Sequence, residues 1–459
     1  MSGKSLLREI YLYYSVVYNK LVSEGCVPMK IKTVPLSYDK VKNLPRPKHF
    51  LPKKPNRILR SVMRIASGFD LKSADFSYTA ERLELAGDGP WLILMNHSSF
   101  IDLKIAETVM KGRPLQIVCT SDGFVGKEWL MRHIGCIPTQ KFVSAPSLVK
   151  DMIHCVKTLG TSILLYPEAS YSFDGTATPL PESLGKCLKV LKVPVVMIET
   201  FGAFARDPLY NGLRLRNVPV SAKVTYLLSP EEIQEKKVFE LNAILKERFS
   251  FDYFKWQKEQ GIRITEDFRA IGLERVLYKC PNCMAEGQTK GEGTTLLCQA
   301  CGKKWELTPL GEMQALPGNT NTESWQESAA EEEQTEFSHI PDWYAWQRSQ
   351  VREEIEKGTY QLDIPVDISI LKDTKAIYQI GEGRLVHHKD GFTLTGGDGK
   401  LHYCQSPKAS YSLYADYFWY ELGDIICIGD AKTLYYCFPK EANIPVAKTR
   451  LATEEMYQL

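Results

Sequence analysis

The stretch WLILMNHSSFIDLK, residues 91–104, decides the fold. Its first five residues are all apolar, and a strand that is apolar on both faces is typical of a parallel sheet covered by helices. Similar short apolar runs recur at 115–119, 162–166 and 193–198, with longer mixed segments between them. We therefore expect an α/β domain with a mostly parallel sheet and helices on both faces. In such sheets ligands bind beyond the carboxyl ends of the strands.

Polar residues stand where two of these runs end. His97 follows the run at 91–95, Asp102 comes five positions later, and Glu168 follows the run at 162–166. A histidine takes a proton from a hydroxyl near neutral pH, and works best when a carboxylate holds its other ring nitrogen. The chain has no GxSxG nucleophile motif, so these residues indicate direct attack by a substrate hydroxyl on an activated acyl group. The alternative is that His97 is a core histidine held by a local cap.

The segment NHSSFID resembles the HX4D signature of the glycerolipid acyltransferases, the PlsC-type 1-acylglycerol-3-phosphate acyltransferase superfamily. Further segments resemble the later blocks of that family, in the same order: GKEWL at 126–130, GCIPTQKF at 135–142, YPEAS at 166–170 and VPVVMI at 193–198. Ordered blocks are far more specific than any one of them alone. The resemblance implies that His97 is the general base and that Asp102 orients it.

The same resemblance implies an acceptor site made of four residues: Asn96, Lys141, Glu168 and Ser170. Lys141 stands where the family often has an arginine for the acceptor phosphate, and it keeps the charge without the two-donor fork. Ala169 replaces the usual glycine, and Tyr171 stands where an arginine is common. These departures leave another lysophospholipid or lipid alcohol open as the acceptor.

The resemblance implies an O-acyltransferase of phospholipid biosynthesis. It would move a fatty acyl group from a thioester, acyl-CoA or acyl-ACP, to the hydroxyl of a lysophospholipid, with 1-acylglycerol-3-phosphate as the expected acceptor. The rival function is a non-catalytic lipid-binding or regulatory protein built on an acyltransferase-like domain.

Two CxxC pairs, CPNC at 280–283 and CQAC at 298–301, predict a zinc ribbon. The expected ligands are Cys280, Cys283, Cys298 and Cys301. Four protein ligands leave no open position, so this Zn²⁺ would be structural. Redox-active cysteines are the competing interpretation. The other eight of the 12 cysteines are scattered, which favours a reducing compartment over disulfides.

The basic stretch from residue 46 to residue 64 combines arginines and lysines with apolar residues. Such a stretch can lie on an anionic membrane surface, or can simply pack on the domain with its charges in water. The sequence contains no run of 18 uncharged apolar residues and no signal peptide pattern near its start. We therefore expect a cytoplasmic protein that is peripheral on the inner face of the membrane.

Composition gives the remaining bounds. The 459 residues carry 44% hydrophobic and 24% charged residues with a net charge of +2, which predicts a globular protein of two or three domains and gives no reason to expect a nucleic-acid partner. The expected divisions are a helical and basic segment at 1–67, an acyltransferase domain at 68–277, the ribbon at 278–310, an acidic linker at 311–340, and a helix plus β-rich domain at 341–459. Alternating β-branched and aromatic runs in this last part suit a pleckstrin-homology-like barrel or a sandwich.

Overall fold

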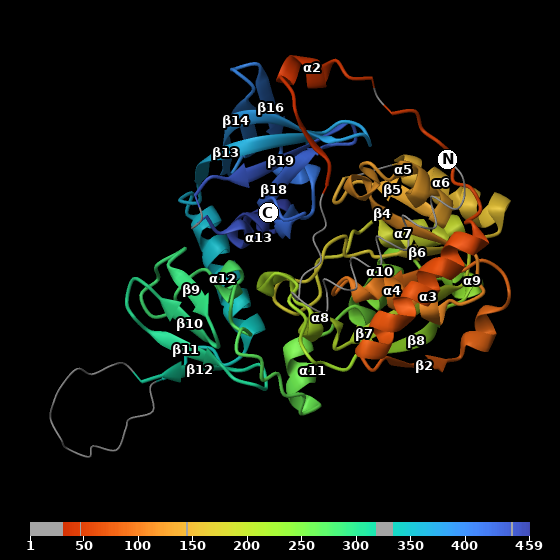
Figure 1. The fold of residues 1–459 in the computed structure, drawn as a ribbon, viewed down its shortest axis with the longest axis horizontal. Helices are drawn as coiled ribbons and strands as arrows, with labels where there is room; N and C mark the ends of the chain where they lie inside the picture. The colour runs from red at the N-terminus through yellow and green to blue at the C-terminus, as the bar shows by residue number, and fades with distance from the viewer. Residues whose placement is uncertain (1–30, 46, 144–145, 318–333, 442–443) are drawn as a thin grey trace.

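The computed structural model describes residues 31–45, 47–143, 146–317, 334–441 and 444–459. The helix expected near the N-terminus, Arg46 and most of the acidic linker lie outside the described residues. The described part contains three sheets, which Figure 1 shows as three groups of strands.

The first sheet has seven strands in the order β2-β8-β7-β3-β6-β4-β5. Their bounds are β2 (Ser77–Glu81), β3 (Leu92–Met95), β4 (Leu115–Thr120), β5 (Cys136–Thr139), β6 (Ser162–Leu165), β7 (Val195–Phe201) and β8 (Ser221–Leu228). The five strands β7, β3, β6, β4 and β5 run parallel, which confirms the expected mostly parallel α/β sheet. Strand β8 runs antiparallel to β7, because the short helix α8 (Ala203–Arg206) and a loop join them instead of a crossover helix. Strand β2 pairs in parallel with β8, so these two strands run opposite to the other five.

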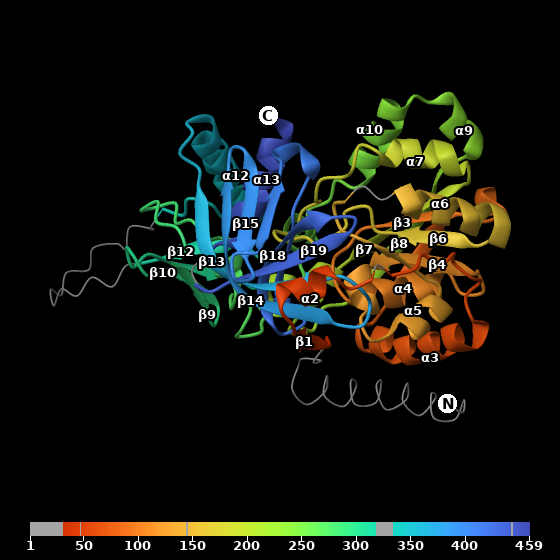
Figure 2. The same cartoon turned by 90° about the horizontal axis from the view of Figure 1, so that it is seen from above.

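Helices cover both faces of this sheet, as Figure 2 shows. One face carries α3 (Arg57–Ser73), α4 (Ile101–Val109) and α5 (Glu128–Ile134); the other carries α6 (Pro146–His154), α7 (Leu184–Leu191), α9 (Pro230–Glu235) and α10 (Val238–Arg248). Alternate residues of β3 enter two different cores: Ile93 packs on the side of α3 and α4, and Leu94 on the side of α7 and α10. This double burial explains why the run at 91–95 is entirely apolar.

The second sheet is the cysteine-containing unit. Its four antiparallel strands are β9 (Thr289–Glu292), β10 (Thr295–Cys298), β11 (Lys304–Leu307) and β12 (Met313–Leu316). The unit therefore runs to residue 316 rather than ending at 310, because β12 pairs with β11. Trp305 of β11 packs edge-on against Trp343 of α12 (Ile340–Glu356) at 5.0 Å between ring centroids, so this unit shares its core with α12.

The third sheet is antiparallel, and its strand order is β16-β15-β14-β13-β19-β18-β17. Strand β1 pairs in parallel with β14. Its bounds are β1 (Thr33–Pro35), β13 (Leu362–Leu371), β14 (Ile377–His388), β15 (Gly391–Gly396), β16 (Leu401–Gln405), β17 (Tyr414–Trp419), β18 (Gly423–Asp430) and β19 (Thr433–Pro439). The described residues also form the α-helices α2 (Tyr38–Lys42), α11 (Tyr253–Glu259) and α13 (Val446–Gln458). We call the part from 360 to 459 the β-rich domain.

The β-rich domain packs against the parallel sheet's domain. The amide of Gly126 donates to the carbonyl of Thr374 at 2.9 Å, and the hydroxyl of Ser410 donates to the carbonyl of Phe142 at 2.9 Å. Both Gly126 and Phe142 lie in loops beyond strand ends, so the β-rich domain faces the edge of the sheet at which ligands are expected.

Candidate functional site

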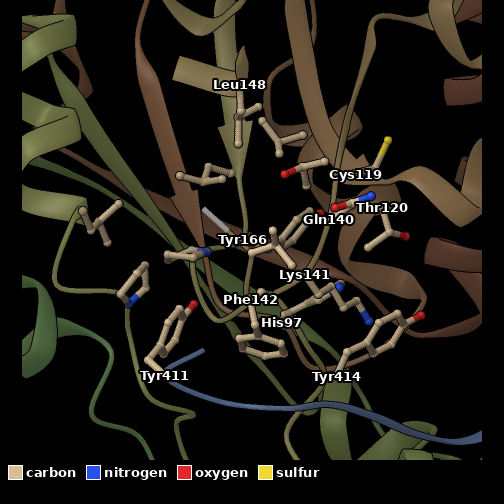
Figure 3. A pocket seen from close by; sticks show the side chains of 18 of the residues that line it. His97, Cys119, Thr120, Gln140, Lys141, Phe142, Leu148, Tyr166, Tyr411 and Tyr414 are labelled. Carbon is tan, nitrogen blue, oxygen red and sulfur yellow. The ribbon is translucent and has the colours of Figure 1, made fainter. Parts of the chain in front are cut away.

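A cavity of about 1750 Å³ lies at the carboxyl edge of the parallel sheet. Each of four strands sends a lining residue into it directly after its end: His97 after β3, Asp122 after β4, Lys141 after β5 and Tyr166 after β6. Figure 3 shows His97, Lys141 and Tyr166 together on its wall. Parallel strands bring these positions to one edge although they are distant in sequence.

His97 and Asp102 form a hydrogen-bonded pair. Asp102 Oδ2 lies 3.1 Å from His97 Nδ1, and it also accepts the amides of Ser98 at 2.7 Å and Ser99 at 3.0 Å. Asp102 is in the first turn of α4 and fully buried, so the turn after β3 fixes its carboxylate. With Nδ1 held in this way, the remaining ring nitrogen, Nε2, is the one that can take a substrate proton.

The imidazole of His97 is held on its faces as well as its edge. Its ring lies 4.3 Å from that of Tyr166 and 4.2 Å from that of Tyr171, between centroids. Burial lowers the pKa of His97, Asp102 raises it, and the charge of Lys141 lowers it further, with a net lowering. The ring is therefore neutral, and able to act as a base, at neutral pH.

Glu168 does not face the cavity. It is completely buried, and its two oxygens accept the backbone amides of His97 and Thr178, each at 2.9 Å. Burial raises the pKa of Glu168 to about 7 against the opposing effect of these hydrogen bonds. Its carboxylate therefore positions the backbone of the base, whereas the sequence led us to expect it in the acceptor site.

Asn96 and Ser170 also lie behind the cavity wall. Asn96 Oδ1 accepts the amide of Thr200 at 2.9 Å, which ties the end of β3 to the end of β7, and Asn96 is 1% exposed. Ser170 is 2% exposed, and its hydroxyl donates to the carbonyl of Tyr171 at 3.4 Å. Of the four expected acceptor residues, only Lys141 lines the cavity.

Ala169 occupies the position where related motifs carry glycine. It lines the cavity with a φ of +58°, in the left-handed region that a side chain disfavours by about 1–2 kcal/mol. The turn after β6 thus accounts for the usual glycine, and this chain folds the same turn with a methyl group.

Lys141 contacts the β-rich domain. Its ammonium lies 3.9 Å from the ring centroid of Tyr414, and the two side chains lie together in Figure 3. The hydroxyl of Tyr414 donates to Asp122 Oδ2 at 2.7 Å, and the indole of Trp419 donates to the same oxygen at 3.2 Å. Strand β17 thereby joins the ends of β4 and β5 across the cavity.

Sequence reasoning missed several lining residues. Asp122 follows the run at 115–119, so the rule that located His97 also applied to it. Tyr414 and Asp416 lie in a different domain, and no local pattern connects them with His97.

The four expected zinc ligands do come together. Their sulfur atoms all lie within 4.8 Å of one another, with Cys280 to Cys301 at 3.8 Å and Cys283 to Cys298 at 3.7 Å. A tetrahedral zinc with bonds of about 2.3 Å requires sulfur separations of about 3.8 Å, whereas a disulfide is about 2.05 Å long. The donor set and its dimensions therefore fit a four-thiolate zinc site. None of the four residues expected in the acceptor site, Asn96, Lys141, Glu168 and Ser170, belongs to this cysteine-containing unit.

A family-model match supports the motif resemblance. Residues 77–198 match the family model described as Acyltransferase, a range that includes His97, Asp102, Lys141 and Glu168. Among solved structures, the chain is similar to the 1-acyl-sn-glycerophosphate (LPA) acyltransferase PlsC from Thermotoga maritima, at 13% identity and a TM-score of 0.35, over 53% of this chain and 94% of that one. No curated protein sequence matches the chain.

Proposed function

We propose that the acyltransferase domain, residues 68–277 with the family match at 77–198, transfers a fatty acyl group from a thioester, acyl-CoA or acyl-ACP, to the hydroxyl of a lysophospholipid in phospholipid biosynthesis. The motif resemblance makes 1-acylglycerol-3-phosphate the first acceptor to test. The observation that carries the proposal is the pairing of His97 Nδ1 with the buried Asp102 at 3.1 Å, on the wall of a cavity large enough for a lipid.

The geometry supports a direct transfer. His97 Nε2 removes the proton of the acceptor hydroxyl as its oxygen attacks the thioester carbonyl. The tetrahedral intermediate collapses, the carbon–sulfur bond breaks, and the imidazolium returns its proton to the departing thiolate. Asp102 keeps the imidazole in the required tautomer and stabilises the imidazolium. Lys141 lines the same cavity as His97, and its charge acts on the base, so it is the cation that we assign to the acceptor's phosphate.

The cavity suits a lipid and a phosphate-bearing donor. Its wall between α6, α7 and α10 is apolar and includes Met152 and Leu184. Val190 and Phe239, which also line it, are 41% and 66% exposed, so apolar surface continues from the cavity to the outside. Lys150 and Lys186 line the same region and offer charge to the donor's phosphates.

Peripheral binding to an anionic membrane is part of the proposal. On α3 the side chains Ile58 and Ile65, seven positions apart and therefore on one face, are 70% and 69% exposed. Lys53, Lys54 and Arg57 are exposed just before them. This composition suits a cytoplasmic leaflet. In the described ranges no helix is both long and apolar enough to cross a bilayer.

One arginine of the basic stretch serves the fold instead. Arg60 is 5% exposed, forms a 2.6 Å ion pair with Glu107 of α4, and donates to the carbonyl of Leu115. We therefore exclude it from the proposed membrane surface.

The remaining parts of the proposal are structural. The cysteine cluster would hold a Zn²⁺ that stabilises the second sheet. For the β-rich domain, the strand order and the closing helix α13 favour the pleckstrin-homology-like arrangement over a sandwich. The rival function, a non-catalytic lipid-binding protein, keeps the cavity but needs no base.

The direct test is acyl transfer by the purified protein. It is incubated with 1-acylglycerol-3-phosphate and either acyl-CoA or acyl-ACP, and the diacyl product is measured by mass spectrometry. Product from the wild type and none from a folded His97→Ala variant supports the enzyme. Lysophospholipid binding without any product, by a folded wild-type protein, would favour the rival.

A further inference from the structure

One wall of the reaction cavity belongs to the β-rich domain. Strand β17 and the loops on either side of it contribute aromatic and acidic lining residues, which face the residues beyond the strand ends of the acyltransferase domain: Tyr411, Tyr414, Asp416, Tyr417 and Tyr420. The cavity that holds His97 is therefore lined by both domains. The acyltransferase domain alone does not complete its own site.

We propose that Asp416 selects the acceptor's head group, favouring a phosphodiester that bears an ammonium group over a phosphate monoester. The inference rests on the proposed transfer to a lysophospholipid and narrows its acceptor class. Lys141 would bind the phosphate, and Asp416 the ammonium.

The charges around Lys141 support this selection. Asp122 accepts a hydrogen bond from the hydroxyl of Tyr414, and Lys141 lies over the ring of the same tyrosine. The charges of Lys141 and Asp122 both act on the pKa of Asp416. Burial raises the pKa of Asp416 to about 6, with Lys141 opposing that rise, so the carboxylate is mainly ionised at pH 7.5. Lys141 and two carboxylates, Asp122 and Asp416, thus line the same cavity. A dianionic head group meets net repulsion there, whereas a zwitterionic one can pair both of its charges.

Hydrogen bonding distinguishes Asp416 from Asp122. Asp122 Oδ2 accepts Tyr414 and Trp419, and its Oδ1 accepts the amide of Gly123 at 2.9 Å. Asp416 Oδ1 accepts the amide of Tyr417 at 2.9 Å, and among the described residues its Oδ2 accepts no hydrogen bond. Asp416 therefore has an oxygen to offer a ligand in the cavity that it lines.

The aromatic surroundings fit the same ligand. The ammonium of Lys141 occupies the ring face of Tyr414, and Tyr411, Tyr417 and Tyr420 also line this wall. Rings of tyrosine attract organic cations by their negative faces, and they do so more strongly where water is excluded. Carboxylate and tyrosine rings on one wall are therefore the chemistry that recognises an ammonium head group.

The test compares two acceptors offered in equal amounts to the full chain with acyl-CoA or acyl-ACP, at pH 7.5: 1-acylglycerol-3-phosphate and lysophosphatidylethanolamine. We expect the wild type to have the higher kcat/KM for lysophosphatidylethanolamine. In Asp416→Asn we expect the ratio to shift toward 1-acylglycerol-3-phosphate by about tenfold or more, because like-charge repulsion is removed. Asp390→Asn, at an exposed hairpin tip, makes the same change of net charge and should leave the ratio unaltered.

Three outcomes separate the inference from its premise. An unchanged ratio in folded Asp416→Asn overturns the inference and leaves the transferase intact. Transfer to neither acceptor by folded wild-type protein contradicts the proposed function. In that case calorimetric titration of each lysolipid, without donor, tests the head-group selection, and equal affinity ratios in wild type and Asp416→Asn overturn it. If Asp416→Asn does not fold, two other variants replace it. Asp416→Glu must keep the wild-type ratio of kcat/KM for the two acceptors, and Lys141→Gln must weaken the binding of both lysolipids.

Discussion

The backbone amide of His97 donates a 2.9 Å hydrogen bond to the buried carboxylate of Glu168. The histidine of the NHSSFID segment is thus held by the acid of the YPEAS segment, through main chain rather than through the imidazole. Two strands that are neighbours in the sheet, β3 and β6, are joined at the point where the proposed chemistry occurs.

Replacing His97 should remove transfer without unfolding the protein. His97→Ala deletes the base, and general-base assistance is worth about 10²–10⁴-fold in rate. Asp102→Asn should also lower kcat, because an amide can hold the ring in the wrong tautomer. Turnover with lysolipid and acyl thioester is measured beside circular dichroism. Wild-type turnover by His97→Ala would end the enzyme proposal.

The acid limb of the pH profile of kcat/KM should be centred below pH 6.5. Burial lowers the pKa of His97 from 6.5, and the base works only when deprotonated, so kcat/KM should rise with pH through this lowered pKa and level off above it. Lys141 contributes to the lowering, so Lys141→Gln should move the limb to higher pH. A limb centred above pH 6.5 in the wild type would contradict the assignment.

Removing Glu168 should cost stability as well as activity. Glu168→Ala leaves the amides of His97 and Thr178 without their acceptor, and each buried unpaired amide costs about 1–3 kcal/mol. The free energy of unfolding is measured by urea denaturation, with Glu235→Ala in α9 as an exposed control. Equal stabilities of the two variants would mean that water replaces the carboxylate.

Freshly purified protein should contain one zinc per chain. Cys280→Ser with Cys283→Ser should remove it, and apparent zinc binding in finger peptides is worth about 10–16 kcal/mol. The region after residue 277 should then become sensitive to protease, since Cys280 and Cys298 lie in the core that contains Trp343 of α12. The four expected zinc ligands do not line the cavity, so part of the activity should remain.

Metal analysis and limited proteolysis decide this prediction. The control is Cys404→Ser, at an exposed cysteine of the β-rich domain, which should keep the full zinc content. Protein isolated without zinc, yet resistant to protease after residue 277, would contradict a structural metal.

Vesicle binding should depend on lipid charge and salt. Each basic residue near an anionic surface is worth about 1 kcal/mol and is screened by salt. Co-sedimentation with anionic vesicles should fall as salt rises, and Ile58→Glu with Ile65→Glu should weaken it further. Leu422→Glu, on an exposed hairpin of the β-rich domain, is the matched control. Binding that ignores both salt and the α3 substitutions would exclude this surface.

The sequence predicted what local pattern determines. The parallel strands were recognisable because each is buried on both faces, and the Asp102 carboxylate was predictable because the turn after β3 returns it to His97 within five positions. The cysteines were found by their spacing alone. Each of these features depends on residues close together in the chain or on strict ligand geometry.

Features that depend on packing between distant segments were not predictable. Glu168 was expected to face substrate, and only the main-chain donors around it show why it turns inward. In the sequence Arg60 could not be distinguished from its basic neighbours, because its buried partner, Glu107 of α4, is distant in the chain. The cavity wall formed by β17 depends on the packing of the β-rich domain against the acyltransferase domain. No periodicity in the sequence of either domain predicts that contact.

The pairing of β1 with β14 has a consequence for synthesis. Thr33 of β1 lies beside Ile377 of β14, and the whole acyltransferase domain lies between these two strands in the sequence. At about 5–20 residues per second, the ribosome makes residue 33 about 17–70 s before its partner. During that interval the parallel sheet can form, while the wall over the cavity cannot. The nascent chain therefore passes through a stage in which the β-rich domain does not yet cover the cavity at His97.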